Sequence, residues 1–360
     1  MRVFDTYEVW DRLKNKDKPI IVYGMGNGAD KIISVFEKNG ISVDGFFASD
    51  GFVRGQIFHG MRVMSYAEAC EKFGDFITVI AFGSSLPDVI RNMRKIDSEK
   101  ECYAPDVPIA GNDIFNAEFY IKNKELIDTA RSLLYDDASR RVYDEMIRFK
   151  LDGKISHFSV DTQKADALNT ILSGGYSAYL DLGAYNGDTI KESLCHFSDI
   201  KKITAFEPSP KIFKKLCAFA DTIDNIEFDL VNACALDTSR VAVFKDGAGR
   251  NSQLLGESEI QAHNAKSISV DCLAPSERCK YRGEKLLIKL DVEGDERSAL
   301  SGLCEIIENN ECELIVSAYH RSADLFELPI YIKNLLPNHK IYLRKHPYIP
   351  AWDINLYITK

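Results

Sequence analysis

The feature that most constrains the fold of this chain is an alternation of short apolar runs with helix-compatible stretches, and it occurs twice. Apolar runs that alternate with amphipathic helices predict parallel strands, because parallel neighbours need a crossover connection. The first block covers about residues 18–111 and the second about residues 174–360. We therefore predict two α/β units, each a sheet with crossover helices.

The first block contains a glycine-rich turn directly after its first apolar run. We expect its strands at residues 19–23, 43–48 and 76–82, and a helix at residues 30–39 that ends at Gly40. The turn has Gly24, Gly26 and Gly28 in the pattern G-x-G-x-x-A between strand and helix, as in dinucleotide-binding loops. A ribose-binding acid is unclear, since the second strand ends at Ala48. A bound nucleotide and a purely structural turn both remain open.

The middle of the chain, residues 112–173, has no strand-like run of comparable strength. Residues 121–150 are charged and helix-compatible. We interpret this segment as a helical connector, and it is also a candidate lid or dimer contact. The expected domains are 1–111, 112–173 and 174–360.

The second block predicts a doubly wound sheet. Its expected strands are at residues 178–182, 202–206, 226–231, 285–290, 313–318, 340–343 and 354–358. The last two are joined by a short connection, which suits an antiparallel hairpin that closes the sheet. Residues 241–275, which include Gly249-Arg250-Asn251-Ser252, are long enough for an extra hairpin that could shape a substrate pocket.

The turn after the first strand of the second block is the most informative stretch. It reads Asp181-Leu182-Gly183-Ala184-Tyr185-Asn186-Gly187-Asp188. Glycines let the backbone adopt positive φ and approach a ligand closely. The acids Asp181 and Asp188 disfavour a pyrophosphate, and they favour a ligand with an ammonium and a sulfonium group, such as S-adenosylmethionine.

The next two strands end in residues that suit an adenosine. Glu207 follows the second strand, 20 positions after Gly187, where a carboxylate can accept both ribose hydroxyls. The third strand leads to Asn232 and Ala233, a polar and a small residue that could border an adenine ring.

Acids and a histidine follow the fourth and fifth strands. Asp291 and Glu293 alternate, so in an extended chain their side chains point the same way. His320 follows the fifth strand and is a natural general base. Either His320 or Asp291 would take a proton, or Asp291, Glu293 and His320 would together hold a Mg²⁺ ion. We interpret Asp295 and Glu296 as a solvated turn at a helix start.

With these residues in hand, the second block resembles the FkbM-type family of S-adenosylmethionine-dependent methyltransferases. The strongest piece is Ile288-Lys289-Leu290-Asp291-Val292-Glu293-Gly294-Asp295-Glu296, and Ala318-Tyr319-His320 looks like the family's late His motif. The resemblance implies a class I methyltransferase fold and O-methylation of a sugar or another hydroxylated metabolite. The expected cofactor-binding residues are Asp181, Gly183, Ala184, Asn186, Gly187, Glu207, Ala233 and Asp291. The first block resembles small Rossmann-like domains of sugar-modifying proteins.

Charge and composition limit the kinds of binding partner that we expect. The net charge of −9 argues against nucleic acid and anionic membranes, and no apolar run approaches the ~20 residues that span a bilayer. We expect a cytoplasmic enzyme with a small-molecule or saccharide acceptor, and a homodimer is a possible assembly. Two other hypotheses stay open: an NAD(P)- or nucleotide-sugar-binding enzyme run by the first block, and a non-catalytic cofactor-binding protein.

Overall fold

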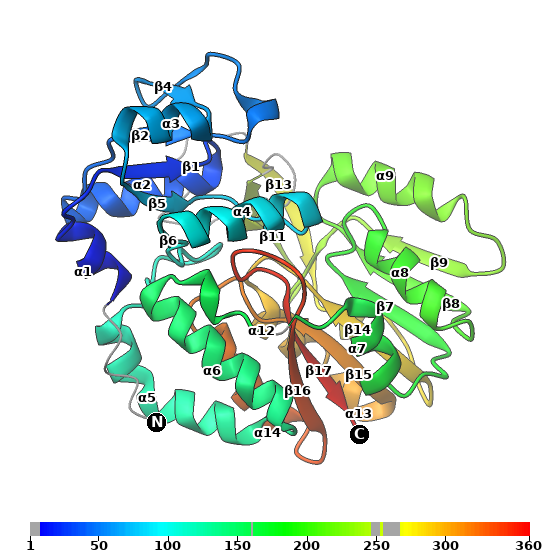
Figure 1. Ribbon diagram of the computed structural model, residues 1–360. Helices are drawn as coiled ribbons and strands as arrows, with labels where there is room; N and C mark the ends of the chain where they lie inside the picture. Colours follow the sequence, from blue (N-terminus) through cyan, green and yellow to red (C-terminus); the bar gives the residue numbers. More distant parts are fainter. Residues whose placement is uncertain (1–7, 160, 246–252, 255–266) are drawn as a thin grey trace.

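The structure is a computed structural model that describes residues 8–159, 161–245, 253–254 and 267–360. It contains two mainly parallel sheets, each with helices on both faces, and a smaller third sheet (Figure 1). Gly249 to Ser252, part of the expected extra hairpin, lie outside the described residues. No helix among the described residues is both long and apolar enough to cross a bilayer.

The first unit has a six-stranded sheet in the order β3-β4-β2-β1-β5-β6. Its strands are β1 (Ile20–Tyr23), β2 (Gly45–Phe47), β3 (Ile57–Phe58), β4 (Met61–Met64), β5 (Ile77–Ile80) and β6 (Glu101–Tyr103). Its helices are α1 (Val9–Lys14), α2 (Asn27–Asn39), α3 (Tyr66–Phe73) and α4 (Pro87–Glu99), with a 3-10 turn η1 (Asp50–Phe52). The three expected strands and the helix that ends at Gly40 are confirmed. The pattern missed β3, β4 and β6.

Strand β1 shows how the sequence fills both faces of this sheet. Side chains alternate between the faces of a strand. Ile20 and Val22 accordingly pack in the cluster that contains α1 and α2 residues, whereas Ile21 and Tyr23 pack in the cluster that contains α3 and α4 residues. A strand buried on both faces is apolar at every position, which is why its run was recognisable.

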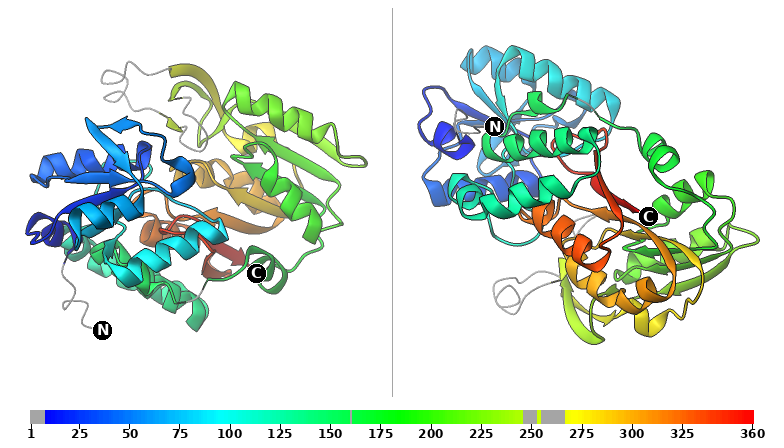
Figure 2. Two further views of the ribbon diagram at one scale, coloured as in Figure 1. Left: turned by 45° about the horizontal axis from the view of Figure 1, so that its top comes forward. Right: turned by 90° about the horizontal axis from the view of Figure 1, so that it is seen from below.

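The middle segment is helical, as expected. It forms α5 (Ala117–Leu133), α6 (Asp137–Asp152), a 3-10 turn η2 (Ile155–His157) and α7 (Lys164–Ile171). Asn116 and Asp136 cap α5 and α6 by accepting hydrogen bonds from the backbone N–H groups of Phe119 and Ser139. Helix α5 packs against α14 (Asp324–Leu335), and α6 packs against β16 (Lys340–Lys345). Figure 2 shows these two helices beside the last strands from further directions.

The second unit has a seven-stranded sheet in the order β16-β17-β15-β14-β7-β8-β9. Its other strands are β7 (Ala178–Leu182), β8 (Lys202–Phe206), β9 (Glu227–Val231), β14 (Lys285–Leu290), β15 (Glu311–Ser317) and β17 (Ile354–Thr359). Its remaining helices are α8 (Asp188–His196), α9 (Pro210–Ala220), α11 (Pro275–Arg278), α12 (Glu296–Gly302) and α13 (Cys304–Asn309). Strand β17 is antiparallel to both β15 and β16, so the doubly wound sheet and its closing hairpin are confirmed.

An additional small sheet confirms the extra hairpin. It consists of β10 (Cys234–Ala235), β11 (Arg240–Lys245), β12 (Gln253–Leu254) and β13 (Ser267–Leu273). Strand β11 pairs with β13 in the antiparallel sense over six residues.

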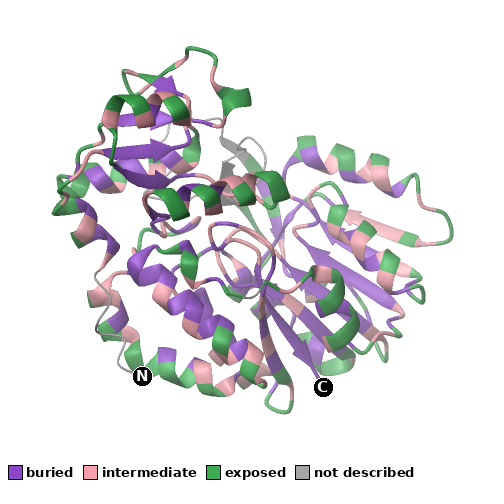
Figure 3. Cartoon of the chain, in the orientation of Figure 1, coloured by how far each residue is buried: buried purple, intermediate pink, exposed green. Residues whose placement is uncertain are grey.

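The two units share an interior. One hydrophobic cluster includes Ile21 of β1, Met146 of α6 and Ile358 of β17, so it continues from the first sheet into the second. Figure 3 shows buried residues along the central strands of both sheets and on one side of α6. The proposed domain boundaries at residues 111 and 173 stay a prediction.

Candidate active site at the carboxyl edge of the second sheet

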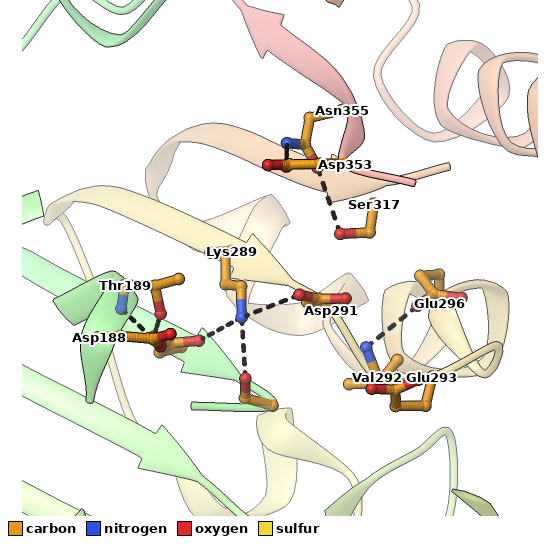
Figure 4. Close-up of polar contacts among 12 residues, drawn as sticks. Asp188, Thr189, Lys289, Asp291, Val292, Glu293, Glu296, Ser317, Asp353 and Asn355 are labelled. Carbon is orange, nitrogen blue, oxygen red and sulfur yellow. Dashed lines mark hydrogen bonds and ion pairs between the residues drawn. The ribbon is translucent and has the colours of Figure 1, made fainter. Parts of the chain in front are cut away.

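A buried ion pair lies at the centre of this edge. Asp181 on β7 is fully buried, and the Nζ of Lys289 on the neighbouring strand β14 lies 3.2 Å from its Oδ1. The Asp181 Oδ2 accepts hydrogen bonds from Thr189 Oγ1 (2.7 Å) and Tyr179 OH (3.1 Å). Burial opposes the charge on Lys289, but the carboxylates of Asp181 and Asp291 outweigh it and raise the Lys289 pKa. Figure 4 shows Lys289 directed toward Asp291 on one side and β7 on the other.

The glycine turn takes its shape from this pair and from the strand beside it. Gly183 (φ +86°) accepts a hydrogen bond from Lys289 Nζ at its carbonyl oxygen (2.8 Å). A Cβ at Gly183 would lie 2.0 Å from the backbone oxygen of Asp291, so no side chain fits there. Gly187 (φ +89°) precedes α8, and Ala184 is buried while Asn186 is exposed. The turn therefore presents its backbone at the sheet edge, as the sequence predicted.

Glu207 follows β8 and is 6% exposed. Its Oε1 accepts a hydrogen bond from the backbone N–H of Ser209 (2.7 Å), and burial raises its pKa to about 7. Asn232 donates to the Glu207 carbonyl oxygen (2.8 Å), which ties the end of β9 to the end of β8. Ala233 is buried beside it. The residues expected around an adenosine thus follow neighbouring strands.

Asp291, Glu293 and His320 lie together, as the sequence predicted. The Nε2 of the fully buried His320 lies 3.3 Å from Asp291 Oδ1 and 3.6 Å from Glu293 Oε2. The backbone between the acids is not extended, since Glu293 has a φ of +55°. This turn, and not the alternation of side chains along an extended strand, brings both carboxylates to the same nitrogen.

Glu296 completes this cluster, and the solvated turn predicted for it is wrong. It does lie in the first turn of α12, but its residue exposure is only 1%. Its Oε1 lies 2.8 Å from His320 Nδ1 and also accepts a hydrogen bond from the N–H of Val292 (3.0 Å). Burial opposes the charge on His320, but Glu296, Glu293 and Asp291 raise its pKa to about 10. The surrounding carboxylates therefore favour the imidazolium form of His320.

Sequence reasoning missed Lys289 and Tyr319 as parts of this site. A lysine inside an otherwise apolar parallel strand is a usable signal, because a buried ammonium group needs a carboxylate nearby. Tyr319 OH lies 3.3 Å from Asp291 Oδ1. Asp291, Glu296 and His320 place ligand-type atoms within 4.8 Å of one another, which is the spacing of a metal site.

A cavity of about 270 Å³ opens in front of this cluster, between the two units. Asp291, Glu293 and Tyr319 line one side of it. The first unit lines the other side with the start of α2 and the end of β5. Neither motif predicted that the two units face one another here.

The glycine turn of the first unit has a packing explanation. A Cβ at Gly28 would lie 2.2 Å from the backbone oxygen of Ala81, and one at Gly24 would lie 3.0 Å from the ring of Phe82. Gly26 has open space around its Cβ position. Gly24 and Gly28 thus let α2 approach the end of β5.

Residues 181–348 match the model of the methyltransferase FkbM domain. The chain is similar to the solved methyltransferase FkbM from Methylobacillus flagellatus, with 19% identity over 95% of this chain and 90% of that one and a TM-score of 0.69. It is also similar to an rRNA methylase from Streptococcus thermophilus, with 13% identity over 57% of this chain and 96% of that one and a TM-score of 0.33. No curated protein matches it in sequence.

Proposed function

We propose that this chain, an S-adenosylmethionine-dependent methyltransferase with an FkbM domain at residues 181–348, methylates a hydroxyl group of a sugar or another hydroxylated metabolite. The family expectation from the motifs is confirmed, and the acceptor is the new part of the proposal. The observation that carries it is the carboxylate cluster of Asp291 and Glu293 at the wall of the cavity.

The cofactor would lie along the edge formed by β7, β8 and β14. Backbone groups of Gly183, Ala184, Asn186 and Gly187 would follow its methionine part, and Glu207 would accept hydrogen bonds from its ribose hydroxyls. When bound, S-adenosylmethionine supplies a sulfonium methyl group that an oxygen nucleophile can attack in line.

Two predicted contacts take a different form in this arrangement. Asp181 is engaged by Thr189, Tyr179 and Lys289, so its role is to position the turn through Lys289 rather than to touch the ligand. Ala233 is buried, so it would border the adenine ring through its backbone.

Of the two predicted proton acceptors, the geometry favours Asp291. Its side chain is 30% exposed and lines the cavity, whereas His320 is fully buried with a carboxylate at each ring nitrogen. An imidazolium has no lone pair for a proton. Asp291 would take the acceptor's hydroxyl proton, and His320 would hold Asp291 and Glu293 in place as a positioning residue.

Mg²⁺ does not fit the cluster in this form. Both ring nitrogens of His320 face carboxylate oxygens, so the imidazolium already stands where a cation would balance the acids. Mg²⁺ also prefers oxygen ligands with near-ideal octahedral geometry. The proposed reaction therefore needs no metal ion.

The test is transfer of a labelled methyl group from S-adenosylmethionine to a panel of saccharides and other polyols, with the product identified as a methyl ether. We expect Asp291→Asn to lower the transfer rate by about 10²–10⁴-fold, and Asp237→Asn, an exposed acid outside the cluster, to leave it unchanged. Products methylated only on nitrogen or carbon would overturn the proposed O-methylation.

A further inference from the structure

The cavity between the two units is built from both of them. The first unit contributes Asn27, Gly28 and Lys31 from the start of α2 and Ala81 and Phe82 after β5. The β16–β17 connection contributes Tyr348, Pro350 and Trp352. Asp291 and Glu293 of the second unit line the same cavity. A ligand in the cavity would touch the first unit and the proposed base at once.

Tyr348 and Trp352 form part of an aromatic wall of the cavity, and the first unit holds this wall in place. Ser84 and Ile349 exchange two backbone hydrogen bonds (2.8 and 3.0 Å), which tie the segment after β5 to the β16–β17 connection. Gly83 lies under the rings of Tyr348 and Trp352, and a Cβ there would be 2.5 Å from the first and 2.6 Å from the second. Only glycine allows this approach, because a Cβ would overlap both rings.

Phe82 extends the wall into the first unit. Its ring meets Tyr23 edge-on, with centroids 4.8 Å apart, and Gly24 leaves it room. Tyr348 and Trp352 are half-buried, with ring centroids 6.0 Å apart and an interplanar angle of 36°. The first-block glycine turn therefore shapes this wall.

Four carboxylates and two lysines line the cavity, which disfavours an anionic ligand and suits one that donates hydroxyl groups. Lys31 Nζ donates to the carbonyl of Ile109 (2.9 Å), and Lys164 Nζ lies 3.1 Å from Asp353 Oδ2. Both lining lysines are thus engaged by groups of the chain. Aromatic rings and carboxylates in one cavity suit a saccharide, since the C–H groups of a sugar ring pack on an aromatic face while its hydroxyls donate to carboxylates.

We propose that the first unit completes the acceptor site, and that the aromatic wall of Phe82, Tyr348 and Trp352 binds the ring of a saccharide acceptor whose hydroxyl faces Asp291. This inference rests on the proposed function, because it assigns the acceptor of the same reaction. It makes the Rossmann-like unit a specificity element rather than a separate nucleotide-binding domain.

Intrinsic fluorescence tests the binding step directly. The chain has two tryptophans, and Trp10 is buried at 6% exposure against Phe36 in the first unit. A Trp10→Phe variant leaves Trp352 as the sole reporter. Titration with methyl α-pyranosides and disaccharides, up to about 100 mM, should change the emission of this variant in a saturable way. No saturable change with any sugar, together with no saturation-transfer signal by NMR, would overturn the proposal.

Kinetic variants test the wall itself. We expect Trp352→Ala to raise the acceptor KM about tenfold or more, with S-adenosylmethionine affinity within twofold of wild type. Gly83→Ala should act in the same direction, since it displaces both rings. Trp352→Phe keeps an aromatic face and should restore most of the loss. If Gly83→Ala lowers the Tm strongly, the acceptor KM values of Trp352→Ala and Trp352→Phe alone test the aromatic wall. An unchanged acceptor KM in Trp352→Ala would refute the aromatic wall.

The outcomes separate this inference from the function on which it rests. Methyl transfer to a hydroxyl that is unaffected by Trp352→Ala keeps the function and refutes the wall. Saturable sugar binding at Trp352 without methyl transfer to any sugar refutes the assigned acceptor role.

Discussion

Replacing His320 by Gln probes the charge balance of the active site. The imidazole is fully buried and has Glu296, Asp291 and Glu293 within 2.8, 3.3 and 3.6 Å of its nitrogens. The variant removes the cation and leaves Glu296, itself 1% exposed, without its counter-charge. Removing one partner of a buried pair costs about 3–5 kcal/mol.

The pKa of His320 gives the pH dependence of this loss. A folded pKa of about 10 against an ordinary value of 6.5 corresponds to about 5 kcal/mol. Because the folded pKa is raised, the stabilisation is fully present below pH 6.5 and disappears as the pH rises through about 10. We therefore expect the variant to melt roughly 10 °C below wild type at pH 6, and the gap to close toward pH 10.

Thermal melts of wild type and variant from pH 6 to pH 10 measure this difference. His346→Gln is the matched control, since His346 is also buried but contacts the neutral groups Thr162 O (2.7 Å) and Tyr357 OH (2.8 Å). Burial lowers the His346 pKa, so its contribution is lost on acidification instead. A His320→Gln gap in Tm that stays constant from pH 6 to pH 10 would refute the imidazolium and the reasoning built on it.

Four further outcomes follow from the same geometry. Glu207→Ala should weaken S-adenosylmethionine binding about tenfold or more, as measured by calorimetry. The affinity of the wild type should rise as the pH passes through about 7, because the Glu207 carboxyl then ionises. An affinity that does not depend on pH would contradict the role of Glu207. Asp291→Asn should lower kcat by about 10²–10⁴-fold in the radiometric assay, with cofactor affinity changed far less. Gly183→Ala should lower the free energy of unfolding by more than about 3 kcal/mol, because its Cβ would lie 2.0 Å from the Asp291 carbonyl oxygen. Gly40→Ala is the control, since Gly40 has a φ of +68° and open space around its Cβ position, and it should lower this free energy by about 1 kcal/mol. Dialysis against EDTA should leave the transfer rate unchanged, and a loss that added Mg²⁺ reverses would restore the metal hypothesis.

The fold of the second unit could be predicted in detail because its central strands are buried on both faces. A run such as residues 285–290 has four apolar residues in six, and it can be recognised from the sequence without knowing which strand pairs with it. Strands β4 and β6 were missed because Arg62 and Glu101 interrupt short stretches near the edge of the first sheet. Edge strands tolerate charge, so their pattern resembles that of loops.

The site was partly predictable for a similar reason. Parallel strands bring their carboxyl ends to one edge, so Asp291, Glu293 and His320 were expected together and are together. The burial of Glu296 could not be expected, because an acid in a first helical turn is usually solvated. Its contact with His320 depends on where the tertiary structure places the start of α12 relative to the residues that follow β15.

The sequence by itself determined the local elements: strands, helix starts, glycine turns and the order of acids along one sheet edge. These follow from side-chain periodicity and backbone sterics over a few residues. Only the tertiary structure decided that the first unit faces the catalytic edge, through Ser84 and Ile349, which are 265 positions apart. Such a contact is selected by the shape and burial of whole surfaces, and no local period in the chain encodes it.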